Sequence, residues 1–450
     1  MQKEKQDLTR GPLGKQILLF SIPLIFSNLL QVLFNMADVA VLGKFAGTAS
    51  LGAVGSTTTL VTMFTDFLIG LSGGINVLTA RHFGAKDKEN LVKTVHTSFL
   101  LSLGIGFLLL LSGWLFSKGI LLQLQTKQEL LDGAILYIRI YFLGMPALAV
   151  YNFGNAVFSA VGETKWPLYY LSIAGVSNVV LNLFFVIACH MDVAGVATAS
   201  VISQYISAFL IVRALVKNND DYALRPEYLH ISGNNARAII HIGVPAGIQN
   251  AIFQMANLFI QTGVNSFSAV FVAGNAAAMN EDAIVFSVMM AFYTACGSFM
   301  GQNYGAGKKE RIRKSYLFSL VYSFGSGLIL GVLMVIFGNP FLRLFTSDMG
   351  VIEAGMYRMI YMGLFLGFSA FMDCTIAASR ALGKSLIPTV FVILGSCVFR
   401  IVWIYTVFAY FQTVPSLYLL YIFSWGITAC AEILYFIKVY KKSISPLPAA

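Results

Sequence analysis

Long apolar segments alternate with short polar ones along almost the whole chain. Each apolar segment is long enough to cross the hydrocarbon core of a bilayer, which takes roughly 20 residues in a helix. This pattern predicts an all-α polytopic membrane protein with twelve transmembrane helices. The expected spans are residues 17–42, 56–80, 94–116, 133–158, 167–189, 193–216, 238–266, 276–300, 315–338, 354–378, 386–409 and 415–438.

The second six segments repeat features of the first six. Proline and asparagine residues of the first span recur 222 residues later, in the pairs Pro23 and Pro245, Asn28 and Asn250, and Asn35 and Asn257. Because each copy holds six spans, the second copy enters the membrane in the same orientation as the first, which predicts parallel repeats. We therefore expect an N-terminal six-helix lobe over 1–216, a linker over 217–237 and a C-terminal six-helix lobe over 238–450.

Composition and charge agree with a membrane protein. Hydrophobic residues make up 57% and charged residues 11% of the sequence, whereas soluble domains carry about 25% charged residues. Of the 30 Lys and Arg residues, 23 fall in the termini and in the loops on one side of the expected spans. The positive-inside rule then predicts that both termini are cytoplasmic. The net charge of +10 is a topology signal and does not indicate a nucleic-acid partner.

The sequence contains no recognisable catalytic motif. Neither a nucleophile elbow, a zinc-binding H-E-x-x-H pair nor a phosphate-binding loop is present, and the five cysteines lack metal-type spacing. The loops are too short to hold a nucleotide-binding domain. We therefore expect a protein that is not an enzyme and that needs no cofactor.

Asp38 is an acidic residue inside the first expected span. An ionisable group in hydrocarbon is costly, so it either has a function or is a paired structural acid. Asn178 and Asn182 lie four residues apart on one face of the fifth span. A carboxylate among amides can exchange a proton or bind a small cation such as Na⁺. The alternative for the two asparagines is that they only hydrogen-bond neighbouring helices.

Other polar and aromatic residues are candidates for a substrate cavity. The first helix of the second half has amides where the first half has Asp38, and they follow helical spacing along one face, which favours either a wet cavity or a polar helix contact. Arg400 is near the middle of its span, and we expect an acidic partner for it among Asp373, Glu281 and Asp282. The expected cavity residues are Gln31, Phe34, Asn35, Asn152, Phe153, Gln254, Asn257, Gln261 and Arg400.

Several motifs together resemble one known family. The stretch IPLIFSNLLQVLFNMADVAVLG, the loop GAKDKENLVKTVHT, AVGETKWP, NVVLN and GQNYGAGKKERIRKSY are similar to those of the multidrug and toxic compound extrusion (MATE) transporters, in the branch of the DNA-damage-inducible proteins. The resemblance spans nearly the whole chain. It implies two six-helix lobes that alternate between outward and inward openings and exchange H⁺ or Na⁺ for an organic substrate.

The resemblance also implies roles for individual residues. Asp38 matches the first-helix acid of that branch, Asn178 the fifth-helix asparagine and Ser200 the sixth-helix hydroxyl, while Pro23 matches the proline at which the first helix bends. The expected helix-bending residues are therefore Pro23 and, by the repeat, Pro245, although prolines in spans are also common as static kinks.

One position departs from the family pattern. Asn182 stands where the family often has aspartate, so the coupling site would hold one carboxylate instead of two. The acid that the sodium-coupled branch has on its seventh helix is also missing. Asp38 is then the expected proton carrier, with Asn178, Asn182 and Ser200 around it and with Na⁺ at Asp38, Asn178 and Asn182 as the weaker alternative.

The sequence as a whole favours a monomeric secondary antiporter of the inner membrane that works by alternating access. Its expected partners are a small organic substrate of cationic, amphipathic character, membrane lipids, and H⁺ or Na⁺. One alternative is a flippase or exporter of a lipid-linked saccharide or another metabolite in the same superfamily. Another is a membrane protein with a structural or signalling role and no transport.

Overall fold

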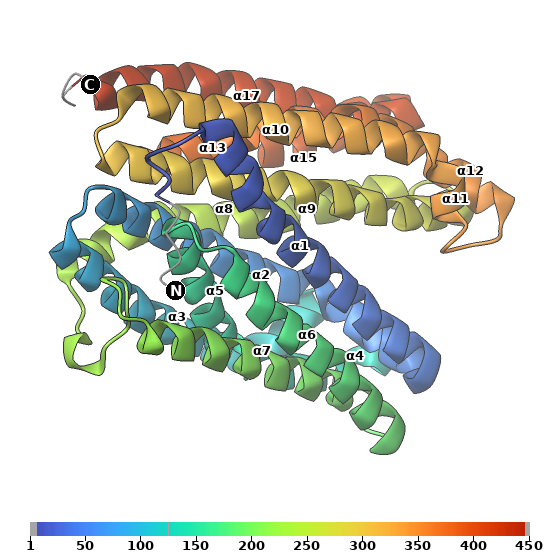
Figure 1. The fold of residues 1–450 in the computed structure, drawn as a ribbon. Coiled ribbons are helices and arrows are strands. Elements are labelled where there is room, and N and C mark those ends of the chain that lie inside the picture. Colours follow the sequence, from blue (N-terminus) through green and yellow to red (C-terminus); the bar gives the residue numbers. More distant parts are fainter. Residues whose placement is uncertain (1–6, 125, 446–450) are drawn as a thin grey trace. The chain divides into compact units, whose positions relative to one another are not determined.

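The computed structural model describes residues 7–124 and 126–445, and these residues form helices that follow one another along the chain (Figure 1). The first half contains α1 (Leu13–Val41), α2 (Gly47–Gly84), α3 (Lys88–Gln123), α4 (Gln128–Phe142), α5 (Met145–Ala160), α6 (Lys165–Leu183) and α7 (Asp192–Lys217). The second half contains α8 (Gly233–Asn265), α9 (Ala269–Gly305), α10 (Lys309–Ile336), α11 (Gly338–Leu342), α12 (Met349–Phe365), α13 (Ser369–Ala381), α14 (Leu386–Val392), α15 (Phe399–Trp403), α16 (Ala409–Phe411) and α17 (Val414–Ile444).

The all-helical prediction is confirmed, and each expected span corresponds to a helix or a short series of helices. Among the described residues, nine helical segments are long and apolar enough to cross a membrane, and a pair bent by 47°, α4 and α5, brings the number to ten. The first of the nine, Leu13–Gly84, covers two expected spans in 72 continuous helical residues. The amide-rich α8, at the expected span 238–266, is outside this set although it is 33 residues long.

Helix starts are defined by polar caps at several loops. The side chain of Asp87 accepts a hydrogen bond from the backbone N–H of Asn90 at the start of α3, and Ser268 does the same for Phe271 at the start of α9. Thr413 and Ser416 cap α17 reciprocally, with a proline in the first turn. Such caps satisfy backbone donors that have no partner within the helix.

The chain divides into two compact units whose boundaries fall inside helices. Of the described residues, unit 1 contains 26–247, and unit 2 contains 7–25 together with 248–445. These boundaries differ from the expected lobes 1–216 and 238–450, because α1 and α8 each contribute to both units. The helix α1 changes unit three residues after Pro23, and α8 changes unit three residues after Pro245.

Small residues explain why the first part of α8 belongs to unit 1. A Cβ on Gly70 of α2 would lie 2.5 Å from the backbone nitrogen of Gly247, and one on Gly74 would lie 2.7 Å from that of Gly243. Glycines four residues apart on both helices thus let the two backbones meet, as small residues do at many helix contacts in membranes.

Unit 2 repeats this arrangement with the first part of α1. Ala291 and Ala295 of α9 stand 221 residues after Gly70 and Gly74 in the sequence. Both alanines are completely buried, and they form one core cluster with Phe20. The first helix of each repeat therefore packs its first part in the other unit. The internal repeat is seen in this packing as well as in the sequence motifs.

Candidate functional site

Three helices of unit 1 bring the predicted coupling residues together. The helix α1 carries Asp38, α6 carries Asn178 and Asn182 on one face, and α7 carries Ser200. Asn178, Asn182 and Ser200 are buried, whereas Asp38 is partly buried. Asn182 and Ser200, which follow Asp38 by 144 and 162 residues in the sequence, thus meet it at one place.

Hydrogen bonds connect the four side chains in a closed set. Asn182 Nδ2 donates to Asp38 Oδ1 at 2.5 Å, and Ser200 Oγ donates to Asp38 Oδ2 at 3.4 Å. Asn178 Nδ2 donates to Ser200 Oγ at 3.4 Å, while its Oδ1 accepts from Asn182 Nδ2 at 3.2 Å. Both carboxylate oxygens therefore have neutral donors, which can stabilise a buried negative charge only in part.

No basic side chain of the described residues forms an ion pair with Asp38. Among the residues that the structure describes, no Lys, Arg or His lies within 4 Å of its carboxylate. The Oδ1 atom of Asn182 is buried and has no hydrogen-bond partner among these residues. A carboxylate without a counterion, next to an unused amide oxygen, offers hard oxygen ligands to a small cation or a position for a proton.

Two tyrosines of α4 belong to the surroundings of Asp38 and were missed by the sequence analysis. Tyr137 and Tyr141 stack with their ring centroids 5.7 Å apart, and both lie close enough to Asp38 to interact with it electrostatically. Their spacing of four residues on a span was the available signal, because it puts both rings on one helical face.

A glycine lets α1 approach α6 beside these side chains. A Cβ on Gly175 of α6 would lie only 1.7 Å from Cε2 of Phe34, so the phenyl ring occupies the space that any other residue at 175 would fill. Phe34 therefore packs against α6. Its neighbours Gln31 and Asn35 are exposed in unit 1.

Two other expected cavity residues of the first half lie in the interior. Asn152 is buried and donates a hydrogen bond to the Leu148 carbonyl of its own helix, at 3.0 Å. Phe153 is completely buried, with its ring centroid 5.6 Å from that of Phe99. Phe153 is thus a core residue in this structure, because α5 is buried on almost every side.

The amides in the second part of α8, from Gln254 to Asn265, are partly buried or exposed. Gln261 Nε2 donates to Asn265 Oδ1 at 2.8 Å along the helix, and Asn257 is exposed. Gln254 is partly buried and has a polar interaction of its own. All of these side chains lie on the part of α8 that belongs to unit 2.

Among the described residues, no carboxylate lies within 4 Å of the Arg400 guanidinium, but Asp373, one of its three expected partners, is near enough to interact with it electrostatically. The Nε of Arg400 donates to Ser424 Oγ at 3.0 Å, and its guanidinium lies 4.8 Å from the ring centroid of Tyr421 and 5.0 Å from that of Phe253. Aromatic faces attract a buried cation, which explains how it is held without a carboxylate in contact. Asp282 pairs instead with Arg358 at 2.5 Å.

The family model MatE matches the chain twice, over residues 23–184 and 245–406. The two matches begin at Pro23 and Pro245 and cover well over half of the sequence. Their offset of 222 residues is that of the repeated proline and asparagine residues. The family match therefore follows the internal duplication.

Individual proteins resemble the chain over most of its length. A probable multidrug resistance protein of Bacillus subtilis, YpnP, is 27% identical, and the match covers 80% of this chain and 81% of that protein. A protein of Shewanella oneidensis called FAD transporter is 22% identical, over 78% of each chain.

The fold has a close match among solved structures. The outward-facing conformation of a multidrug resistance MATE family transporter of the MOP superfamily has a TM-score of 0.91 and 21% identity, and the match covers 98% of this chain and 99% of that one. With the double family match and the shared fold, the chain belongs to the MatE family, the multidrug and toxic compound extrusion transporters, which transport compounds and are not enzymes.

Proposed function

We propose that the protein is a secondary antiporter that exports organic compounds in exchange for H⁺ or Na⁺, with Asp38 as the coupling residue. The single observation that carries this proposal is the carboxylate of Asp38, hydrogen-bonded by Asn182 and Ser200 and without a basic partner in the described part of the chain. Such a group can take up and release a cation without breaking an ion pair.

The mechanism follows from the different affinities of two conformations. A proton or Na⁺ at Asp38 favours one arrangement of the transporter, and the organic substrate favours the other. Each ligand then lowers the affinity for the other, because the coupling free energy between two sites is reciprocal. The absence of a second carboxylate at position 182 favours the proton as the coupling ion.

The substrate class is proposed from the relatives. The Bacillus protein is called a probable multidrug resistance protein, which supports export of varied organic, often cationic, compounds. The Shewanella protein is called a FAD transporter, which supports a second candidate, the export of an anionic metabolite. The cytoplasmic position of both termini is proposed from the asymmetry of basic residues. The bacterial inner membrane is proposed from the bacterial relatives.

Transport in everted membrane vesicles tests the proposal. Vesicles with the protein should accumulate ethidium when a proton or sodium gradient is imposed, and vesicles without it should not. The second candidate, export of an anionic metabolite, is tested by adding FAD outside the same vesicles and measuring its accumulation. If neither gradient drives movement of either compound, the transport proposal fails and a structural or signalling role remains.

A further inference from the structure

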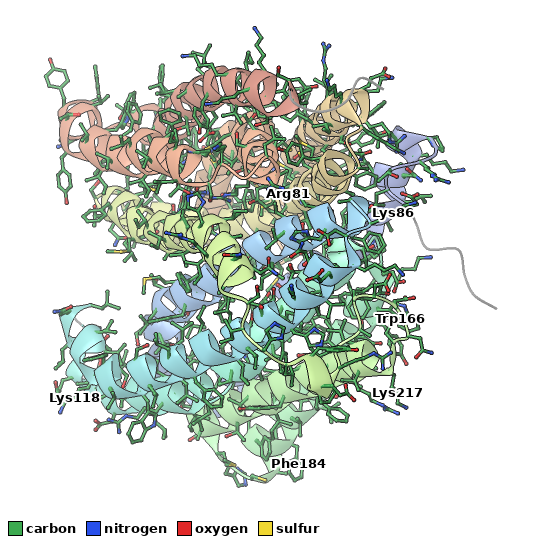
Figure 2. All side chains as sticks on the ribbon, turned by 90° about the vertical axis from the view of Figure 1, so that its left-hand side faces the viewer. Arg81, Lys86, Lys118, Trp166, Phe184 and Lys217 are labelled. Carbon is green, nitrogen blue, oxygen red and sulfur yellow. The ribbon has the colours of Figure 1, made fainter. Side chains whose placement is uncertain are left out.

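The seam between α6 and α7 ends in a polar cavity. These two helices are antiparallel neighbours in unit 1, so the start of α6 and the end of α7 lie at the same end of the pair (Figure 1). Figure 2 shows Trp166 and Lys217 at this end of the two helices. Together with Arg213, Tyr169 and Tyr170 they line a cavity of about 590 Å³.

The two basic side chains of this cavity form no contact ion pair with the residues that the structure describes. Arg213 and Lys217 are exposed, lie four residues apart on α7, and make no ion pair within 4 Å in the described ranges. Two acidic residues, Glu163 and Asp220, also line the cavity and keep their charge, but they interact with Tyr222 and form no ion pair within 4 Å with Arg213 or Lys217 among the described residues. The hydroxyl of Tyr222 donates to Glu163 at 3.2 Å, and it also interacts with Asp220. The basic pair is therefore the part of the cavity that can receive an anion.

A second, apolar groove continues along the same seam. It has a volume of about 520 Å³ and shares Ile173 of α6 and Leu210 of α7 with the polar cavity. Tyr205 and Phe209 also line it, and Phe209 is 66% exposed. Residues 205, 209, 213 and 217 form one stripe along α7 because they are four apart, with the aromatic part in the groove and the basic part in the cavity.

We infer that this seam binds one anionic phospholipid. Its phosphate lies at Arg213 and Lys217, the interfacial rings of Trp166 and Tyr169 flank the headgroup, and one acyl chain follows the groove. Basic pockets between transmembrane helices are sites for anionic headgroups, and Trp and Tyr favour the membrane interface. The orientation proposed from the basic residues assigns this lipid to the cytoplasmic leaflet.

The cavity and the groove are continuous, so they can bind a single lipid molecule at a defined position. Attraction of lipids to a charged surface would not do this. Two basic side chains alone would attract anionic lipid headgroups without selecting one molecule. The groove, which continues from the cavity, adds a defined binding position for one acyl chain. A phospholipid therefore fits both parts at once, whereas inorganic phosphate fits only the first.

Native mass spectrometry of the purified full chain tests this site. The protein is mixed with equal amounts of phosphatidylglycerol, phosphatidylethanolamine and phosphatidylcholine, and the lipid retained on the protein is identified. We expect one phosphatidylglycerol molecule to be retained in preference to the others. In the double variant Arg213→Gln, Lys217→Gln the affinity should fall about 25-fold, since each basic side chain near an anionic surface contributes about a factor of five.

Two further variants separate the possible explanations. Lys441→Gln, Lys442→Gln removes two exposed basic residues from the end of α17, outside the cavity, and should leave retention unchanged. Ala214→Trp keeps both charges but fills the cavity, and should abolish selective retention. The melting temperature of each variant shows whether it is folded.

Several results would overturn the inference. The first is equal retention of the three lipids. The second is displacement of phosphatidylglycerol by inorganic phosphate, and the third is unchanged selectivity in the folded Arg213→Gln, Lys217→Gln variant. Asp38→Asn should retain the lipid like the original protein. Lipid binding and the proposed exchange reaction can therefore fail independently of each other.

Discussion

Asn182 on α6 donates a hydrogen bond to Asp38 on α1, with 2.5 Å between Nδ2 and Oδ1. The bond holds the carboxylate beside an amide at the position where the family often has a second acid. Because the amide is neutral, the pair carries at most one negative charge. Two carboxylates bind a hard cation better than one, so this difference favours the proton in the exchange that we propose.

The variant Asn182→Asp should make transport more sensitive to sodium. It sets a second carboxylate beside Asp38, and two such groups repel each other unless a cation or proton lies between them. In proteoliposomes we expect the rate driven by a sodium gradient to rise several-fold relative to the rate driven by a proton gradient. Asn182→Leu is the control, because it removes the hydrogen bond without adding charge. An unchanged ratio in Asn182→Asp would argue against cation binding here.

Gly175→Ala should destabilise the protein by about 1–3 kcal/mol, the usual cost of overpacking. The added methyl carbon would meet the ring of Phe34, because its place lies 1.7 Å from the Cε2 atom of that ring. The double variant Gly175→Ala, Phe34→Ala should show a favourable coupling energy, because the smaller side chain makes room. Thermal unfolding in detergent measures both effects, and strictly additive losses would contradict the contact.

Arg358→Met should cost up to about 3–5 kcal/mol, because it leaves the carboxylate of Asp282, which is partly buried, without its ion-pair partner. The guanidinium lies 2.5 Å from Asp282 Oδ2 and also donates to Asn275 Oδ1 at 2.9 Å. Asp282→Leu, Arg358→Met should recover much of the loss, since the unpaired charge is then gone. A double variant as unstable as the single one would show that the hydrogen bond to Asn275 matters more than the ion pair.

The start of α3 should loosen in acid. Hydrogen bonds from the side chain and backbone of Asn90 lower the pKa of Asp87 below its usual value of 3.8. A lowered pKa in the folded protein means that the cap stabilises the helix above pH 3.8, and that this contribution disappears as the pH falls through the folded pKa. Hydrogen exchange at residues 88–91 should speed up over that range, and Asp87→Ala should remove the pH dependence.

The helices and the residues around Asp38 were predictable because both leave a local signal. Apolar length identifies spans, and a carboxylate in such a span is rare enough to stand out. Asn178 and Asn182 share a face by their spacing alone. Ser200 came only from the family resemblance, because a serine in a membrane helix is common and carries no signal by itself.

Other features depend on packing that the hydrophobic pattern does not encode. The first part of α1 packs in unit 2 and the first part of α8 in unit 1, yet nothing in their own apolar residues specifies the partner helix. The surroundings of Arg400 were predicted only in part. The expected Asp373 interacts with Arg400 electrostatically, but the groups in direct contact with the guanidinium are Ser424 and aromatic faces from other segments.

The most direct test of the central claim is cation counterflow in proteoliposomes that contain the original protein or Asp38→Asn. The original protein should move H⁺ or Na⁺ into the lumen as the organic compound leaves it. Asp38→Asn should abolish both fluxes while its melting temperature stays close to that of the original, because the amide keeps the shape of the side chain but cannot carry the charge. Coupled fluxes that persist in Asp38→Asn would contradict the account.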